Sequence, residues 1–359
     1  MKKIILTGGG TAGHVTPNLA LIPELLKDGW EIHYIGTKSG MERSLVEPIE
    51  GVTYHAVQSG KLRRYFDLKN FTDPFRVLAG AAESARLVRK IKPDIIFSKG
   101  GFVSVPVVFG ASLNRVPVLV HESDMTPGLA NRLSTPFAKA VCCTFPEAAA
   151  QAGKKGVVTG TPMRRDLFEG RYEEGLKRFG FNDSRPVLMV TGGSSGAQAI
   201  NKALRTALPD LIESFQILHL CGKGNMDMNF AGSKNYRQVE YLTDEMKDAY
   251  ACASVVVSRA GSNTLCELLA LKKPTLLIPY PKEASRGDQI LNARSFESRG
   301  LARVLMQEDM TPDTLSAAIV DTYKDRGALI DAMEREASSD GVSNVMALIH
   351  RYARHREQE

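Results

Sequence analysis

The sequence predicts an α/β protein built from two Rossmann-like domains, whose mostly parallel sheets flank a central cleft. The first observation is an apolar strand at residues 4–7 that runs into a loop of glycine and hydroxyl residues at 8–14. The second is a strand of similar build at 187–191, about 180 residues later, that runs into another such loop at 192–197. Because N–H groups at the start of a helix bind anions, each loop predicts a nucleotide-type domain.

Apolar strands alternate with helical patterns along both halves, which predicts mostly parallel sheets. In the first half we expect strands at residues 3–7, 31–35, 94–97, 117–120 and 140–144. In the second half we expect them at 187–191, 216–221, 237–241, 255–258 and 275–279. The first helix should begin near Thr16 and Pro17, with a late start or a kink because Pro23 lies in its second turn.

The chain of 359 residues is longer than one hydrophobic core usually supports, so we expect separate domains. We assign residues 1–163 to an N-terminal domain, 164–340 to a C-terminal domain and 341–359 to a C-terminal helix. Residues 160–165 and the polar, charged stretch up to 186 are interpreted as the link between the domains.

No stretch of the sequence is apolar enough to cross a membrane, and the chain passes from Lys2 and Lys3 directly into a short strand rather than an apolar signal segment. We therefore expect a protein that stays in the cytoplasm. Its five cysteines show no CxxC spacing and no neighbouring histidine cluster. This pattern predicts core thiols rather than a disulfide framework or a zinc site.

Positive charge is concentrated in residues 61–92, where nine Lys and Arg outnumber three acidic residues, a surplus of six that equals the net charge of the chain. The first part of this window interleaves basic and aromatic residues, including Arg63, Arg64, Phe66, Phe71 and Phe75. Apolar anchors beside cations favour contact with an anionic membrane surface. The alternative is a helix whose aromatic side chains pack inward and whose charges are solvated. Binding of nucleic acid is not expected, because no nucleic-acid-binding motif accompanies the patch.

Gly8, Gly10 and Gly13 match G-x-G-x-x-G after a strand, which alone would suggest a dinucleotide site. The acidic residue that would bind a ribose hydroxyl after the second strand is missing. NAD is therefore disfavoured, and only an NADP-dependent oxidoreductase that uses Lys38 remains as an alternative.

The first glycine loop ends in His14, whose neutral imidazole could accept a proton from a substrate hydroxyl near pH 7. A purely structural histidine is the other interpretation.

A third strand and turn, residues 255–264, again place small residues before a helix and so offer N–H donors to phosphate. In that helix Glu267 could accept hydrogen bonds from a ribose diol, or it only interacts with the helix dipole. Arg164 could donate to a diphosphate, or it is an exposed charge in the link. Residues 286–293 follow a proline-containing turn and present polar groups that suit sugar hydroxyls.

Six motifs, taken in this order, resemble those of the MurG family, the peptidoglycan N-acetylglucosaminyltransferases that act on lipid I. They are residues 9–14 (GGTAGH), 98–104 (SKGGFVS), 121–124 (HESD), 161–164 (TPMR), 192–197 (GGSSGA) and 259–264 (RAGSNT). The resemblance implies a GT-B glycosyltransferase that needs no metal ion or other cofactor. The C-terminal domain would hold UDP-N-acetylglucosamine, and the N-terminal domain would face a polyprenyl-diphosphate-linked muramoyl peptide. The C-terminal helix would return to the N-terminal domain.

The resemblance also implies roles for individual residues. Ser194 and Arg164 would bind the diphosphate, the backbone near Leu242 the uracil, Glu267 the ribose and Gln289 the sugar hydroxyls. Thr11, Ala12, Gly13, Asp124, Ser262, Asn263 and Thr264 would complete the UDP-N-acetylglucosamine site, with Gly100, Gly101 and Ser104 on the acceptor side. The implied reaction is one inverting displacement, in which the C4 hydroxyl of N-acetylmuramic acid attacks the anomeric carbon and UDP leaves. Either His14 or Glu122 would accept the proton.

Some positions depart from the usual pattern of the family: Ala12 replaces glycine, Ser123 and Asp124 replace glutamine and asparagine, and Thr161 replaces asparagine. A carboxylate cannot donate as an amide does, so Asp124 leaves open a related GT-B transferase with another lipid-linked or small-molecule acceptor. A catalytically idle protein that keeps the fold is a further alternative. A lipid-linked acceptor favours the membrane interpretation of residues 61–78, which implies a peripheral protein on the cytoplasmic face of the cell membrane.

Overall fold

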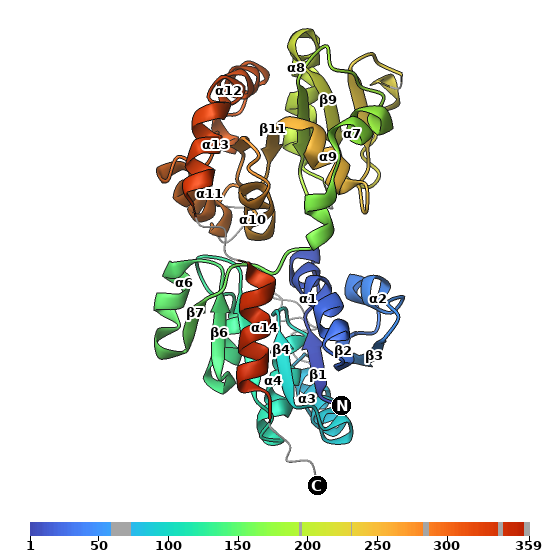
Figure 1. Cartoon of the computed structure of the whole chain (residues 1–359), viewed down its shortest axis with the longest axis vertical. Helices are drawn as coiled ribbons and strands as arrows, with labels where there is room; N and C mark the ends of the chain where they lie inside the picture. The colour runs from blue at the N-terminus through green and yellow to red at the C-terminus, as the bar shows by residue number, and fades with distance from the viewer. Residues whose placement is uncertain (59–72, 194–195, 231, 283–286, 337–339, 355–359) are drawn as a thin grey trace. The chain divides into compact units, whose positions relative to one another are not determined.

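The computed structural model describes residues 1–58, 73–193, 196–230, 232–282, 287–336 and 340–354, except for the side chains of 73–78. The chain forms two compact units, one of Met1–Arg164 with Ser339–Glu359 and the other of Arg165–Ser338. Each unit has a parallel sheet at its centre, covered by helices (Figure 1). The α/β class with two Rossmann-like units is therefore confirmed.

The first unit contains a seven-stranded sheet of order β3-β2-β1-β4-β5-β6-β7, in which neighbouring strands are parallel. Its strands are β1 (Lys3–Thr7), β2 (Glu31–Thr37), β3 (Val52–Val57), β4 (Ile95–Ser98), β5 (Val118–Glu122), β6 (Ala140–Cys143) and β7 (Gly156–Val158). Its α-helices are α1 (Thr16–Lys27), α2 (Met41–Val46), α3 (Asp73–Ile91), α4 (Ser104–Leu113), α5 (Leu129–Ser134), α6 (Pro146–Gln151) and α14 (Gly341–Tyr352). Alternate residues of β1 enter different apolar cores: Ile4 and Leu6 join one, and Ile5 joins the other.

The C-terminal helix α14 belongs to the first unit, where it lies beside α1 and β4 (Figure 1). Val342, Val345, Met346 and Ile349 recur at helical spacing, and all four side chains are buried in the core that contains Ile4. The two ends of the sequence therefore share one hydrophobic core.

The second unit contains a six-stranded parallel sheet of order β10-β9-β8-β11-β12-β13. Its strands are β8 (Val187–Thr191), β9 (Gln216–Leu220), β10 (Tyr236–Val239), β11 (Ala253–Ser258), β12 (Thr275–Leu277) and β13 (Arg303–Val304). Its α-helices are α7 (Tyr172–Phe179), α8 (Gln198–Ser214), α9 (Met246–Cys252), α10 (Ser262–Ala270), α11 (Asp288–Ser298), α12 (Pro312–Lys324) and α13 (Arg326–Arg335). In the part of the chain that the structure describes, no helix is long and apolar enough to cross a membrane.

Three strands of the structure, β3, β7 and β13, were not predicted. All three lie at the edges of their sheets. β3 carries mixed polar and apolar residues and is only partly buried, while β7 and β13 span three and two residues. The predicted strands are mostly central ones, which are buried on both faces and therefore read as continuous apolar runs. Edge strands lack that signal.

The helix α1 begins at Thr16, which confirms the predicted start near Thr16 and Pro17. It continues through Pro23 to Lys27, so the alternative of a late start is wrong. Thr16 does not act as the N-cap, because its hydroxyl donates to the carbonyl of Ala12 at 2.7 Å. A 3₁₀ turn, η1 (Ala12–His14), precedes the helix and connects it directly to the glycine loop.

The interpretation of residues 165–186 as a link is also wrong. This stretch contains the 3₁₀ helix η5 (Arg165–Glu169) and α7, and both belong to the second unit. Leu167, Leu176 and Phe179 are buried in its core. The strongly polar exposed face of α7 hid this short apolar stripe.

Both sheets place a topological switch point where the sequence places its glycine loops. In each unit the first strand, β1 or β8, lies beside the fourth, β4 or β11, and strands are added outward on both sides of this pair. The loops that follow two such strands turn to opposite faces of the sheet and leave a crevice for ligands at its carboxyl edge. The loops of residues 8–14 and 99–104 share this edge in the first unit, and those of 192–197 and 259–264 share it in the second.

Candidate active site

The glycine loop after β1 is held against its own sheet by two buried side chains. The Tyr34 hydroxyl donates to the carbonyl of Gly8 at 2.7 Å, and the Asn18 amide donates to the carbonyl of Thr7 at 3.3 Å. Gly10 has a φ of +88°, which an L side chain rarely adopts. The two hydrogen bonds therefore hold the loop on the sheet, and the backbone of the loop stays accessible at the carboxyl edge.

Glu42 fixes the same loop from the side. Its fully buried carboxylate accepts hydrogen bonds from the N–H groups of Gly10, at 3.2 Å, and Thr37, at 2.9 Å. Although burial acts in the opposite direction, hydrogen bonds from Thr37 and Gly10 lower the pKa of Glu42. A Cβ atom on Gly9 would lie 2.6 Å from this carboxyl group. The sequence offers no signal for this contact, because Glu42 lies in a different helix, α2.

His14 closes the turn η1 and is half-buried. Its Nδ1 lies 3.1 Å from the Thr11 hydroxyl, which orients the imidazole ring. When Nδ1 donates to Thr11, the lone pair lies on Nε2, and that nitrogen is then the basic one. The contact with Thr11 therefore orients the ring and is compatible with the tautomer that a general base requires.

The loop after β4 packs directly onto the first glycine loop. Gly100 and Gly101 have φ values of +97° and +83°, and a Cβ atom on Gly101 would lie 2.3 Å from the carbonyl oxygen of Gly9. Only glycine allows this approach. Ser104 is fully buried, and its hydroxyl donates to the Gly101 carbonyl at 2.7 Å, so it supports the loop from within.

Glu122 ends β5 and holds the turn that follows. Its carboxylate accepts from the N–H groups of Asp124 and Gly128, both at 3.0 Å, and from the amide of Asn131 at 2.8 Å. Burial raises the pKa of Glu122, although the Asn131 hydrogen bond acts in the opposite direction. The buried ammonium of Lys99 donates to the Ser123 hydroxyl beside it. Asp124 is half-buried at the same edge.

In the second unit, a buried polar network supports the loop of residues 192–197. His219 bonds the Asn201 side chain at 2.9 Å and the Tyr236 hydroxyl at 2.8 Å, and Asn201 donates to the carbonyl of Cys221 at 2.8 Å. Burial lowers the pKa of His219 to about 3, so the ring is neutral in the folded protein at pH 7. Gly196 has a φ of +76° and packs on the Cys221 carbonyl. This network therefore supports Gly196, two residues before α8.

The turn between β11 and α10 presents a helix N-terminus at the same edge. Ser262 is buried, and the side chains of Asn263, Thr264 and Glu267 are half-buried. The Tyr250 hydroxyl donates to Glu267 at 3.1 Å. Burial, together with the neighbouring carboxylate, raises the pKa of Tyr250. The hydrogen bond from Tyr250 thus holds one carboxylate oxygen and orients the Glu267 side chain.

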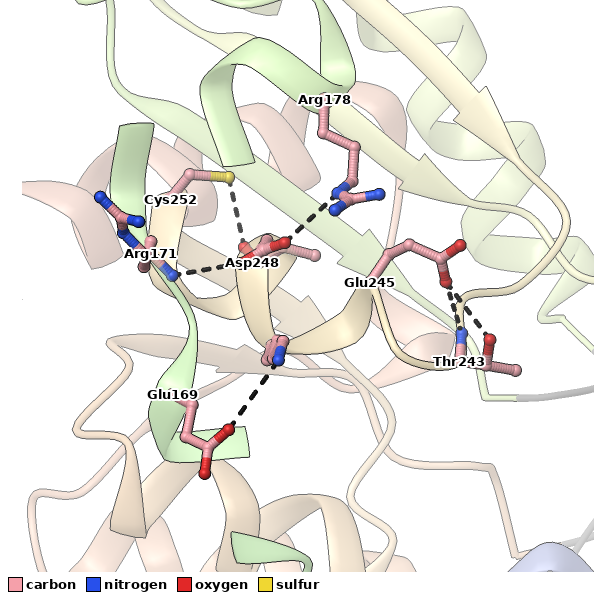
Figure 2. Close-up of polar contacts among 9 residues, drawn as sticks. Glu169, Arg171, Arg178, Thr243, Glu245, Asp248 and Cys252 are labelled. Atoms are coloured by element: carbon pink, nitrogen blue, oxygen red, sulfur yellow. Dashed lines mark hydrogen bonds and ion pairs between the residues drawn. The ribbon is translucent and has the colours of Figure 1, made fainter. Parts of the chain in front are cut away.

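Leu242 lies in a loop that is tied down on both sides. Its side chain packs against the core that contains α7 and α9. Directly after it, Glu245 accepts from the N–H and the hydroxyl of Thr243 at 3.2 and 3.3 Å (Figure 2). Asp248 then accepts from the N–H of Arg171 at 3.1 Å and from the Arg178 guanidinium at 3.2 Å. The backbone near Leu242 therefore has a defined position.

Arg259 is a residue that the sequence prediction missed as part of the site. It follows β11 and is only 5% exposed. Its guanidinium donates to the carbonyls of Ile278 and Pro279 at 3.0 and 3.2 Å and lies over the Tyr280 ring, 4.0 Å from its centroid. The N–H of Tyr280 in turn donates to the side-chain oxygen of Gln289 at 3.2 Å. Its position directly after a buried strand is the feature of the sequence that could have indicated a role for Arg259.

The structure thus gathers most of the predicted residues at two sheet edges. The loops after β1, β4 and β5 carry one set: Thr11, Ala12, Gly13, His14, Gly100, Gly101, Ser104, Glu122 and Asp124. The second unit carries Leu242, Ser262, Asn263, Thr264, Glu267 and Gln289, while Arg164 is the last residue of the first segment. Ser194, Arg63, Arg64, Phe66 and Phe71 lie outside the described residues, and for Phe75 only its place in α3 is described.

Comparison with known proteins gives a consistent result for both units. Residues 4–143 match the N-terminal domain of glycosyltransferase family 28, and residues 187–349 match its C-terminal domain. A UDP-N-acetylglucosamine--N-acetylmuramyl-(pentapeptide) pyrophosphoryl-undecaprenol N-acetylglucosamine transferase of Clostridium botulinum is 52% identical over 99% of this chain and 100% of its own length. A relative of the same name from Lachnospira eligens is 53% identical over 97% of this chain and 99% of its own.

A solved structure supports the same assignment. The crystal structure of Acinetobacter baumannii MurG matches with a TM-score of 0.76 at 25% identity, covering 98% of this chain and 100% of that one. The architecture, the motifs and the near-complete coverage of these relatives agree with one another. This chain therefore belongs to glycosyltransferase family 28 and, within it, to the MurG family.

Proposed function

We propose that this enzyme transfers N-acetylglucosamine from UDP-N-acetylglucosamine to the C4 hydroxyl of N-acetylmuramic acid in lipid I, which forms lipid II for peptidoglycan synthesis. The observation that carries the proposal is the 52% identity, over essentially both full lengths, to a transferase named for this donor and acceptor. Family membership also removes the NADP-dependent oxidoreductase as an alternative, because glycine loops of this kind serve a sugar nucleotide equally well.

The donor would occupy the carboxyl edge of the second unit. N–H groups at the starts of α8 and α10 suit the diphosphate. By the family resemblance, Arg164 would add a charge-assisted donor. Glu267 would accept from the ribose diol, and the fixed backbone near Leu242 would bind the uracil. When the bond between the anomeric carbon and the phosphate oxygen breaks, these donors stabilise the negative charge on departing UDP.

The acceptor would lie over the loops of the first unit, with His14 as general base. The C4 oxygen of N-acetylmuramic acid bonds to the anomeric carbon, and its proton passes to Nε2 of His14. Two observations favour His14 over Glu122: its ring is half-buried rather than enclosed, and the Glu122 carboxylate already accepts three hydrogen bonds. Glu122 would then support the acceptor loop.

The direct test is release of UDP by the purified protein with UDP-N-acetylglucosamine, with and without a lipid I analogue, in the presence of a metal chelator. We expect release that depends on the acceptor and resists the chelator. Donor binding without release would point instead to another acceptor, for which Asp124 is the first residue to examine, or to an idle relative. Release that the chelator abolishes would contradict the metal-free mechanism.

We also propose contact with an anionic membrane surface on the cytoplasmic side, since the acceptor is lipid-linked. The predicted segment around residues 61–78 lies mostly outside the described residues, but a second surface supports the idea. On α4, α5 and the turn η3 (Thr135–Phe137), five large apolar side chains are 42–63% exposed: Phe109, Leu113, Leu129, Leu133 and Phe137. The rings of Phe109 and Phe137 are 5.9 Å apart, so these elements form one patch. Such patches serve as membrane contacts.

We expect replacement of Phe109 and Leu133 by serine to reduce binding to anionic vesicles roughly tenfold or more, because burial of the exposed part of each side chain, less than half of its surface, contributes about 1 kcal/mol. Sedimentation with phosphatidylglycerol vesicles measures this. Phe168→Ser is the matched control, because Phe168 is 55% exposed but lies in the second unit. Equal losses in the control and the double variant would count against the patch.

A further inference from the structure

The guanidinium of Arg259 is buried beside the turn that follows β12. Burial lowers its pKa, and none of its hydrogen-bond partners is charged: they are the carbonyls of Ile278 and Pro279 and the side-chain oxygen of Gln307, at 2.7 Å. Among the described residues, no carboxylate forms an ion pair with it. A buried charge with only neutral partners is costly to maintain. Stabilisation of the fold therefore does not explain why an arginine occupies this position.

Those contacts fix one turn. The guanidinium binds two successive carbonyls at the end of β12 and stacks on the ring of the next residue, Tyr280. A planar fork of donors that also stacks on an aromatic face is specific to arginine, and lysine cannot reproduce it. The position of the Tyr280 N–H is thus set by Arg259.

The Tyr280 N–H then decides which way the Gln289 amide points. A backbone N–H can only donate, so the atom that it contacts at 3.2 Å must be the oxygen of Gln289. The NH₂ group consequently points away from Tyr280. Gln289 lies in the first turn of α11, is half-buried, and its NH₂ group has no protein partner among the described residues.

We propose that Arg259 is a positioning residue that acts through Tyr280 to make Gln289 a dedicated hydrogen-bond donor to an oxygen of the donor sugar. This inference rests on the proposed use of a UDP-linked sugar, with Gln289 at the sugar. It goes further in assigning the polarity of the contact and the residue that enforces it. With the amide held in this orientation, the NH₂ group could only donate, so its partner on the sugar would have to be an oxygen rather than an N–H group.

Binding measurements test the inference without requiring the acceptor. Calorimetry would compare UDP with UDP-N-acetylglucosamine for the wild type, Arg259→Lys, Gln289→Glu and the double variant. Gln289→Glu keeps an oxygen for the Tyr280 N–H but has no N–H to offer the sugar. We expect each single variant to weaken UDP-N-acetylglucosamine about tenfold and to bind UDP, which has no sugar, within about twofold of wild type. The double variant should be no more than about twofold weaker than the weaker single variant.

Additive losses in the double variant would overturn the proposal, as would equal losses for UDP and UDP-N-acetylglucosamine in Arg259→Lys. If Arg259→Lys does not fold, Tyr280→Leu removes the stacking partner and must give the same sugar-specific loss. Arg185→Lys is the control. Arg185 precedes β8, at the opposite edge of the sheet, and its guanidinium donates to the carbonyl of Ile212 in α8. If the wild type binds neither ligand, the proposed function itself fails rather than the role of Arg259.

Discussion

Replacing His14 by alanine should reduce turnover by roughly 10²–10⁴-fold, the usual contribution of a general base, while the affinity for UDP-N-acetylglucosamine stays within about threefold of wild type. The physical reason is that His14 lies in the first unit, where we propose that the acceptor binds, and would contribute to proton removal in the transition state rather than to donor binding. Single-turnover rates with a lipid I analogue, together with calorimetric titration of the donor, measure the two quantities separately.

Thr11 provides a finer test of the same role. Thr11→Val keeps the shape of the side chain but removes the hydroxyl that lies 3.1 Å from Nδ1 of His14. We expect a smaller loss, about tenfold in kcat, since the ring would remain but would no longer be oriented by the Thr11 hydroxyl. Glu122→Gln is the competing variant. A larger loss of kcat in Glu122→Gln than in His14→Ala, with unchanged thermal stability, would transfer the role of base to Glu122.

The glycine loops could be predicted from sequence because their signal is local. Each consists of a buried apolar strand, glycines that permit positive φ, and the start of a helix, and all three parts are adjacent in the chain. Strand order could not be read in the same way, yet the alternation of strands and helices restricts it to a few parallel arrangements. The two switch points then bring together loops that lie about 90 and 70 residues apart.

The parts that could not be predicted depend on contacts between remote segments. Glu42 fixes Gly10 from another helix, and Arg259 reaches Gln289 only through the turn after β12. The spacing of apolar and polar residues along the sequence does not indicate contacts between segments that are far apart in it. The exposed patch on α4 and α5 could not be predicted for a different reason. Its apolar residues recur at helical spacing and look like core positions, and only the fold shows that they stay exposed among the described residues.

Replacing Glu267 by alanine should weaken binding of UDP by about 10–100-fold, because hydrogen bonds to a charged acceptor contribute roughly 1.5–3 kcal/mol. The Tyr250 hydroxyl donates to one oxygen of this carboxylate at 3.1 Å, which orients the Glu267 side chain on the second turn of α10. Calorimetric titration with UDP measures the change. Tyr250→Phe, which keeps the carboxylate and removes only its buried support, should cause a loss of less than about tenfold.

The sugar of the nucleotide can show whether Glu267 acts directly. If the carboxylate accepts from the ribose diol, the wild type should prefer UDP to 2′-deoxy-UDP, and Glu267→Ala should bind both with nearly equal, weak affinity. If the variant binds both more weakly but keeps the preference, then Glu267 acts by holding Tyr250 and the neighbouring loop, and another group reads the ribose. The ratio of the two affinities separates these mechanisms because a general loosening of the site lowers both affinities together, whereas a lost ribose contact penalises only the ligand that makes it.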